Sequence, residues 1–264
     1  MKHTFGIYAT LAYLFVLGAA PALAAEPWRP GVEAASGYAA TRAGVVSFAV
    51  RTEHRVWGRD AARTVPSASV LKAMLLVAYL RRPEVRDRPL AASDRALLGP
   101  MIRWSDNVTA TSVRNIVGDA GLVRLARRAG MRRFRPASPV WGLSSVDAAD
   151  QSRYLLHIDR LVPKRHRAYA LRLLGSVVSS QRWGVAQVRP PGWALYFKGG
   201  WGSGSGAVDH QVALLRRGTR RIAVAIMTTS SPSHAYGKAT LEGVARRLLR
   251  HLGAASIPAG SAGH

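Results

Sequence analysis

Stretches with the residue pattern of β-strands lie near both ends of the chain, and a long middle region separates them. They are "VVSFAVR" (45–51), "HRVWG" (54–58), "WALYFKGGW" (193–201), "AVDHQVALLRR" (207–217) and "RRIAVAIMTTSS" (220–231). The middle, about 69–184, shows helical patterns broken by proline and glycine. This order predicts an α+β fold: one antiparallel sheet built from both chain ends, flanked by helices, with an inserted all-helical subdomain.

Two further helices are predicted beside the sheet. Residues 31–44 form one that stops at Gly44, and residues 235–253 form another, with an apolar stripe that can lie on the sheet. We expect one domain over residues 25–253, followed by a flexible tail at 254–264. At 264 residues and 48% hydrophobic content, such a domain can bury a substantial core.

The N-terminal segment has the features of an export signal. Lys2 and His3 precede an apolar run that ends in the small-residue pattern Ala22-Leu23-Ala24, so residues 1–24 are predicted to be a signal peptide. The alternative is an uncleaved membrane anchor, because the run approaches the roughly 20 residues that span a bilayer. No later stretch is apolar enough to span, and we expect a secreted or cell-envelope protein.

The charge of the chain is strongly positive but dispersed. The formal net charge is +24, and only five of the 38 basic residues are lysine. The arginines come in scattered pairs without zinc-ligand spacing or stacking aromatics, which argues against a nucleic-acid partner. Anionic cell-wall polymers or lipid headgroups are the partners that such a surface suggests. The chain has no cysteine, which is compatible with export when the core suffices.

The stretch "SASVLKAM" (67–74) places a lysine inside an apolar run. Ser69 and Lys72 are three residues apart, on the same side of a helix, so the amine can reach the hydroxyl. Burial lowers the pKa of a lysine, and such an amine can take a proton from a serine. The alternative is that Ser69 only caps the helix and Lys72 extends to solvent.

Two further motifs follow in order. "MIRWSDNVTA" contains Ser105-Asp106-Asn107, and "YFKGGWGSG" contains Lys198-Gly199-Gly200 at the end of a predicted strand. S-x-x-K, S-D-N and K-T-G form the motif set of class A β-lactamases and penicillin-binding proteins. From about residue 31 to 253, the chain resembles the serine β-lactamase and penicillin-binding protein superfamily, and class A β-lactamase-like serine hydrolases most closely.

The resemblance implies roles for the first two motifs. Ser69 would be the acylated nucleophile, and Lys72 its base or proton relay. Ser105 would pass a proton toward the leaving nitrogen, and Asn107 would hold Lys72 and the substrate amide.

The third motif would line the cleft. Lys198 would supply positive charge for a substrate carboxylate, and Gly200 would lie beside it on the same strand. The backbone N–H groups of Ser69 and Trp201 would form the oxyanion hole. Taken separately, Ser105-Asp106-Asn107 could be a helix N-cap and Lys198 an exposed strand residue. The occurrence of all three motifs in order favours the catalytic interpretation.

The chain departs from this pattern at two places. Gly199 stands where the family has Thr or Ser, so a hydroxyl that helps bind the substrate carboxylate is missing; Ser203 or Ser205 would be the substitutes. The family also places a deacylating glutamate in a loop that here reads "RFRPASPVWGLSSVDAAD" (133–150), and no glutamate lies between residues 85 and 241. Asp147 and Asp150 are the acidic candidates there, although Ser144-x-x-Asp147 is typical of a capping box that begins the next helix.

Other groups of polar residues in the sequence give weaker evidence for a catalytic site. Asp209 and His210 are adjacent on a strand and should point to opposite faces, which argues against a Ser-His-Asp triad. We expect no metal and no cofactor. Three functions stay open: a hydrolase of β-lactams or related amides and esters through a Ser69 acyl-enzyme, a cell-wall D,D-peptidase or transpeptidase acting on peptidoglycan-derived substrates, and a non-catalytic protein that binds cell-wall components or a partner.

Overall fold

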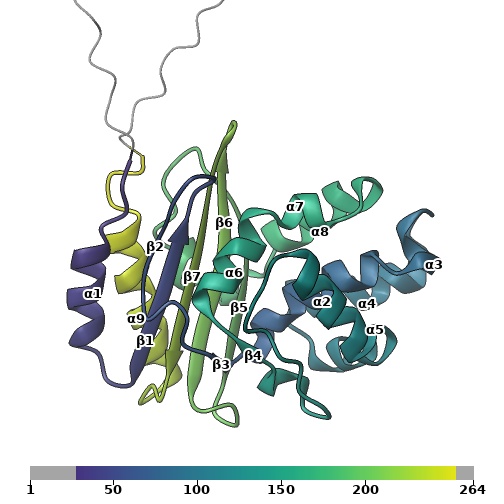
Figure 1. Cartoon of the computed structure of the whole chain (residues 1–264), viewed down its shortest axis with the longest axis horizontal. Coiled ribbons are helices and arrows are strands. Elements are labelled where there is room, and N and C mark those ends of the chain that lie inside the picture. Colours follow the sequence, from purple (N-terminus) through teal and green to yellow (C-terminus); the bar gives the residue numbers. More distant parts are fainter. Residues whose placement is uncertain (1–27, 254–264) are drawn as a thin grey trace, which may run out of the picture.

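The computed structural model of the protein describes residues 28–253 (Figure 1). The predicted signal peptide (1–24) and the predicted tail (254–264) lie outside the described residues. The helices are α1 (Val32–Ala40), α2 (Leu71–Leu80), α3 (Pro83–Arg86), α4 (Ala92–Arg103), α5 (Asn107–Arg128), α6 (Ala148–Leu156), α7 (Ile158–Leu161), α8 (Arg167–Gly175) and α9 (His234–Leu248). The strands are β1 (Val45–Arg51), β2 (Val56–Arg59), β3 (Val65–Pro66), β4 (Ser145–Val146), β5 (Ala194–Gly202), β6 (Val208–Arg217) and β7 (Arg220–Thr229).

One five-stranded sheet joins the two ends of the chain. Its order is β2-β1-β7-β6-β5, and each neighbouring pair is antiparallel. Strand β1, from the N-terminal part of the chain, pairs with β7, from the C-terminal part, and Phe48 lies opposite Ile226. The predicted α+β fold is confirmed.

Helices cover both faces of the sheet. In Figure 1, α1 and α9 lie together on one side, and the helical subdomain lies on the other. Along β6, Val212 and Leu214 pack in the core on the subdomain side, whereas Ala213 and Leu215 pack against the α1 and α9 side. Because successive strand residues face opposite sides, a strand covered on both faces is apolar throughout its length.

Helix α2 forms the centre of the subdomain. All ten of its residues are buried, and α4, α5, α8 and β5 surround it. A helix enclosed on all sides has no polar face, which explains the unbroken apolar run in the sequence. Lys72 lies in this interior helix and therefore has no route to solvent along it.

Two details differ from the sequence prediction. The last helix ends at Leu248 and not at 253, and a turn follows it. The middle region is also not entirely helical, because β4 pairs with β3 in a two-residue ladder, Val65 opposite Val146. Such short strands are held by the surrounding contacts and leave no pattern in the sequence. Within residues 28–253, no helix combines the length and apolarity needed to cross a bilayer.

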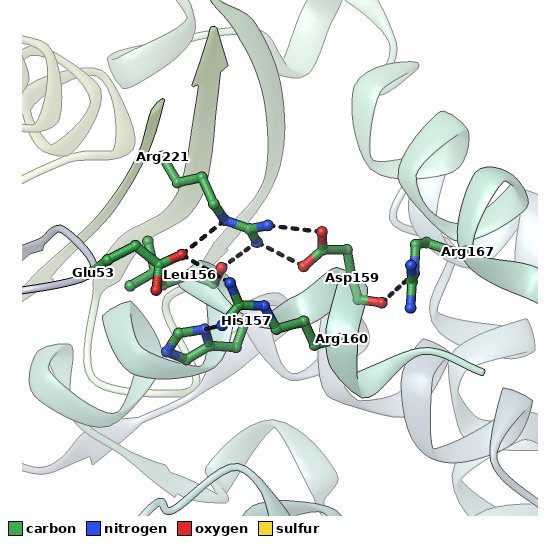
Figure 2. Close-up of polar contacts among 7 residues, drawn as sticks. All are labelled: Glu53, Leu156, His157, Asp159, Arg160, Arg167 and Arg221. Atoms are coloured by element: carbon green, nitrogen blue, oxygen red, sulfur yellow. Dashed lines mark hydrogen bonds and ion pairs between the residues drawn. The ribbon is translucent and has the colours of Figure 1, made fainter. Parts of the chain in front are cut away.

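An arginine-centred network ties the sheet to the subdomain (Figure 2). Arg221, near the start of β7, donates to both carboxylate oxygens of Asp159 at 2.8 and 2.6 Å, and to the backbone oxygen of Leu156. Glu53, between β1 and β2, lies 3.5 Å from Arg221 Nε. The side chains of Arg221 and Asp159 are only 10% and 11% exposed, so this pair is shielded from solvent.

Arg221→Ala is expected to lower the free energy of unfolding by about 2–3 kcal/mol, because it leaves the shielded Asp159 carboxylate and the Leu156 carbonyl without their donor. Urea unfolding measures the change. Arg160→Ala is the control: Arg160 is 61% exposed, binds Glu53 in the same network, and is expected to contribute less than about 1 kcal/mol. Equal effects of the two variants would contradict the assignment of Arg221 as the centre of the network.

Candidate active site

Ser69 lies in a 3₁₀ turn, η1 (Ala68–Val70), between β3 and α2. The turn is fixed from the opposite segment: Ser67 N donates to Ser144 O at 2.8 Å, and Ser67 Oγ donates to Gly142 O at 3.3 Å. Ala68 has a φ of +42°, a left-handed conformation that costs an L-residue about 1–2 kcal/mol. Such a conformation persists only where the surrounding contacts enforce it, and here it directs the neighbouring serine toward the cleft.

Strand β5 passes very close to this turn. A β-carbon at Gly200 would lie 2.8 Å from Ser69 N and 2.7 Å from Val70 N. Only glycine fits this approach. The end of β5, with Trp201, is thereby held beside the backbone of Ser69, as the resemblance implies for an oxyanion hole.

Lys72 is fully buried and points at the second motif. Its Nζ donates to Asn107 Oδ1 at 2.8 Å, to Ser105 Oγ at 3.1 Å and to Ser105 O at 2.5 Å. Burial lowers the pKa of Lys72 to about 7, and the nearby Asp106 carboxylate opposes this shift. Among the described contacts, no hydrogen bond joins Lys72 directly to Ser69, so that predicted contact stays a prediction.

Ser105 connects the two lysines. Its Oγ lies 3.1 Å from Lys72 Nζ and 2.9 Å from Lys198 Nζ, so both lone pairs of this oxygen have donors. The hydroxyl proton is then left for a third partner. Asp106 forms the N-cap of α5 through Thr109 N at 2.7 Å, which fixes the turn that presents Ser105 and Asn107.

Lys198 is fully buried on β5. Besides Ser105 Oγ, its Nζ donates to Gly199 O at 2.8 Å. Burial, and then the charge of Lys72, hold the pKa of Lys198 well below its ordinary value. The structure thus brings Lys72, Ser105, Asn107 and Lys198 into one hydrogen-bonded group, which the sequence motifs predicted from three distant segments.

The pH dependence of Ser69 acylation should follow Lys72. Because the pKa of Lys72 is lowered from 10.5 to about 7, the amine is neutral and can accept a proton above about pH 7. The acylation rate should rise about tenfold per pH unit below that value and level off above it. Acylation followed from about pH 5 to about pH 10 measures this, and a rate that still climbs steeply above pH 9 would contradict a neutral Lys72 base.

A cleft of about 520 Å³ opens beside Ser69. Asn107 and Thr111 of α5 line one side, and residues 139–143 close the cleft. Trp201, Gly202, Gly204 and Ser205 line another side, whereas Ser203 is not part of the lining. In the part of the chain that the structure describes, the residues lining this cleft carry no charged side chain.

Trp141 is a residue that the motifs did not identify. It lies in the segment where a deacylating carboxylate was sought, and its ring centroid is 5.1 Å from Lys72 Nζ. Its Nε1 donates to Thr111 Oγ1 at 3.1 Å, which fixes the indole over α5. No local pattern distinguishes this tryptophan, because its position depends on how the loop folds back on η1.

Asp147 does not reach the cleft. It is the N-cap of α6, accepts from Asp150 N at 2.9 Å, and also accepts from the Arg133 guanidinium at 3.2 Å. The predicted capping role of this segment is therefore correct, but the capping residue is wrong: Asp147 caps α6, whereas Ser144 lies outside the helix and donates to Trp141 O at 2.7 Å. Ser144 is too far from the first turn of the helix to cap it.

Asp209 and His210 take separate partners, as strand alternation predicts. Asp209 Oδ1 lies 2.5 Å from Nδ1 of His234 on α9. His210 Nε2 contacts Pro66 O at 2.9 Å, and its Nδ1 accepts from Thr228 N at 3.1 Å, so it anchors the segment before Ser69. Over residues 28–253, no three His, Asp or Glu side chains gather as metal ligands.

Comparisons with known proteins agree with this geometry. A model of the family described as "Beta-lactamase enzyme family" matches residues 84–252, and no curated protein matches. The match begins after the first motif and includes the second and third.

Solved structures share the fold. A beta-lactamase from Sphaerobacter thermophilus has 19% identity and a TM-score of 0.70, with 86% of this chain and 97% of that chain covered. A beta lactamase from Xanthomonas campestris has 16% identity and a TM-score of 0.73, covering 83% and 96%. An ancestral class A beta-lactamase has 20% identity and a TM-score of 0.68, covering 83% and 98%. The family model spans more than half of the sequence, and the chain therefore belongs to the beta-lactamase enzyme family.

Proposed function

We propose that the protein is an exported serine hydrolase that reacts with amides and esters, β-lactams among them, through an acyl-enzyme on Ser69. The observation that carries this proposal is the buried group of Lys72, Ser105 and Lys198 beside a serine at the cleft. Export is supported by the sequence of residues 1–24, and the basic surface suits an anionic cell envelope.

Acylation follows from these positions. Ser69 Oγ attacks the carbonyl carbon while its proton passes to neutral Lys72, and the N–H groups of Ser69 and Trp201 stabilise the oxyanion. Lys72 is bonded to Ser105 Oγ, so the proton can move through this hydroxyl to the leaving nitrogen or oxygen as the tetrahedral intermediate collapses. Asn107 holds Lys72 in place throughout.

Release of the acyl group is the weaker step in this proposal. Hydrolysis needs a base for the incoming water, and the described residues lining the cleft include no carboxylate and no histidine. Of the two acidic candidates, Asp147 is engaged as a helix cap, and Asp150 accepts from the backbone N–H groups of Arg132 and Arg133. We therefore expect the acyl-enzyme formed with a β-lactam to persist, which keeps the D,D-peptidase or transpeptidase alternative open. Within this alternative, transfer to an amine is favoured over hydrolysis, because an amine is a stronger nucleophile than water.

Intact-mass spectrometry tests the proposal. The purified protein and its Ser69→Ala variant are mixed with a penicillin and, separately, with a p-nitrophenyl ester. One acyl group should add to the parent protein and none to the variant. If neither donor labels the parent, or if the variant is labelled equally, the chain is not a Ser69 enzyme and the non-catalytic alternative gains support. Transfer of the acyl group to an added D-amino acid would select the transpeptidase alternative.

A further inference from the structure

The third motif contains Gly199 because an indole occupies the adjacent space. A β-carbon at Gly199 would lie 2.9 Å from Trp183 Cη2 and 3.0 Å from Trp183 Cζ2. These are rigid ring atoms of a buried side chain, so a Thr or Ser at this position would displace the ring. Trp183 thus occupies the space beside Gly199 that a Thr or Ser side chain would need.

Trp183 is firmly held. Gln211, the partner of Gly199 on β6, is fully buried and donates its Nε2 to Trp183 O at 2.8 Å, while its Oε1 accepts from Val185 N at 2.6 Å. Gly184 between them has a φ of +65°, and a β-carbon there would lie 2.5 Å from Gln211 Oε1. A glycine and a buried amide thus fix the backbone that presents the indole.

Trp183 belongs to an aromatic wall, defined here as Trp183, Trp201 and His234. The rings of Trp183 and Trp201 meet edge to face, with centroids 5.9 Å apart, and His234 stacks on Trp201 at 5.6 Å. Asp209 binds His234 Nδ1 from behind at 2.5 Å. Trp201 extends from this wall into the lining of the cleft beside Ser69.

The two lysines near this wall are buried behind the cleft surface: Lys72 Nζ lies 5.1 Å from the Trp141 ring and Lys198 Nζ 6.0 Å from the Trp201 ring. Within the described chain, the cleft lining has no charged side chain, although 38 of the 264 residues are lysine or arginine. Lys198, the cation that the third motif provides, is fully buried and directed at Ser105 and at the Gly199 carbonyl. A carboxylate that enters this cleft loses water without meeting an exposed cation, and such desolvation is unfavourable.

We propose that the cleft selects acyl donors that carry no carboxylate beside the reacting carbonyl, namely neutral esters and amides whose apolar part packs on Trp201 and Trp141. This inference rests on the proposed Ser69 chemistry and names its substrate class. An uncharged group gains apolar contact with the two indoles and has no charge to desolvate.

A matched pair of donors tests the selection. Benzylpenicillin and its methyl ester differ only at the carboxyl group, and the rate constant for Ser69 labelling is measured for each by intact mass. Each rate is divided by the rate of alkaline hydrolysis of the same compound, which removes the difference in intrinsic reactivity. The methyl ester should acylate about 10-fold faster. Faster acylation by the free acid would overturn the inference and leave the proposed function intact, whereas no label from these or a p-nitrophenyl ester would overturn the proposed function itself.

Three variants test whether Trp183 and Gly199 cause the selection. Trp183→Ala combined with Gly199→Thr makes room for the hydroxyl and should shift the ester-to-acid ratio at least 5-fold toward the acid, relative to Trp183→Ala alone. A thermal unfolding curve shows whether each variant is folded. The rate of acylation by the p-nitrophenyl ester shows whether its nucleophile is still reactive. Ser205→Ala tests the remaining hydroxyl, because Ser205 lines the cleft and its Oγ donates only weakly, at 3.4 Å, to Gly202 O. Selective loss of the acid reaction in Ser205→Ala would show a carboxylate site at Ser205 and overturn the inference.

Discussion

Lys72→Met is expected to slow acylation of Ser69 by about 100- to 10,000-fold, the usual contribution of a positioned general base. The variant removes the amine whose pKa is lowered to about 7, and leaves the nucleophile and the cleft lining unchanged. Met has a similar length and no charge to bury, but it leaves the Asn107 Oδ1 and Ser105 oxygen acceptors without their donor, so some loss of stability is expected and is measured beside the rate. The acylation rate is measured by stopping the reaction at successive times and determining the acylated fraction by intact-mass spectrometry.

Lys164→Met is the matched control, because Lys164 is exposed and lies in the short helical turn before α8, remote from the motifs in sequence. It should acylate at the parent rate. Equal rates for Lys72→Met and the parent would show that another group takes the Ser69 proton. Thermal unfolding separates this outcome from a loss of structure.

Gly200→Ala is expected to lower the acylation rate by about 100-fold. The added β-carbon would meet Ser69 N at 2.8 Å and Val70 N at 2.7 Å, and backbone cannot move aside as a flexible side chain can. Either β5 or η1 must shift, which separates the two N–H groups proposed for the oxyanion. Loss of one such donor costs about 100- to 1,000-fold in other enzymes.

Gly204→Ala provides the comparison, because Gly204 also lines the cleft but a β-carbon there has no atom within 4 Å. Its acylation rate should stay within about threefold of the parent. If Gly200→Ala reacted at the parent rate, the close approach of β5 to Ser69 would have no role in the chemistry.

The sheet and the order of the three motifs could be predicted from the sequence for a physical reason. Strands buried on both faces, such as β6, leave long apolar runs, and the chain ends that carry them must meet in one core. A lysine in a fully buried helix is likewise visible, because so few lysines occur in apolar surroundings. Lys72 alone does not decide between a buried base and a solvent-exposed lysine, and only the motifs that contain Ser105, Asn107 and Lys198 favour the base.

The contacts that shape the cleft could not be predicted in this way. Gly199 and Trp183 lie on different segments, and only the fold shows that one excludes a side chain from the other. The left-handed Ala68 is held by tertiary contacts of its neighbour Ser67, and alanine gives no sign of such a conformation. The sequence offers two caps for α6 three residues apart, Ser144 and Asp147, and only the bond from Asp150 N identifies Asp147 as the cap.

The persistence of the acyl group is the property in which this protein should differ most from a hydrolase with a complete water-activating site. Trp141 lies near Lys72 in the loop segment that carries the water-activating glutamate in the pattern described above. If release to water is slow, the protein forms an acyl-enzyme readily, and the rate of turnover depends on which acceptor attacks it. When an amine or alcohol acceptor attacks, Lys72 and Ser105 are placed to take its proton and return it to Ser69 Oγ as the acyl–oxygen bond breaks.

The most direct measurement is the time course of the Ser69 adduct after excess donor is removed. The protein is labelled with the p-nitrophenyl ester, separated from free donor, and followed by intact mass, with the labelled peptide identified by proteolysis and tandem mass spectrometry. A single adduct on Ser69 that forms at one group per chain and decays over many minutes is the predicted result. An adduct on another residue, or substrate turnover with no detectable adduct, would contradict the account.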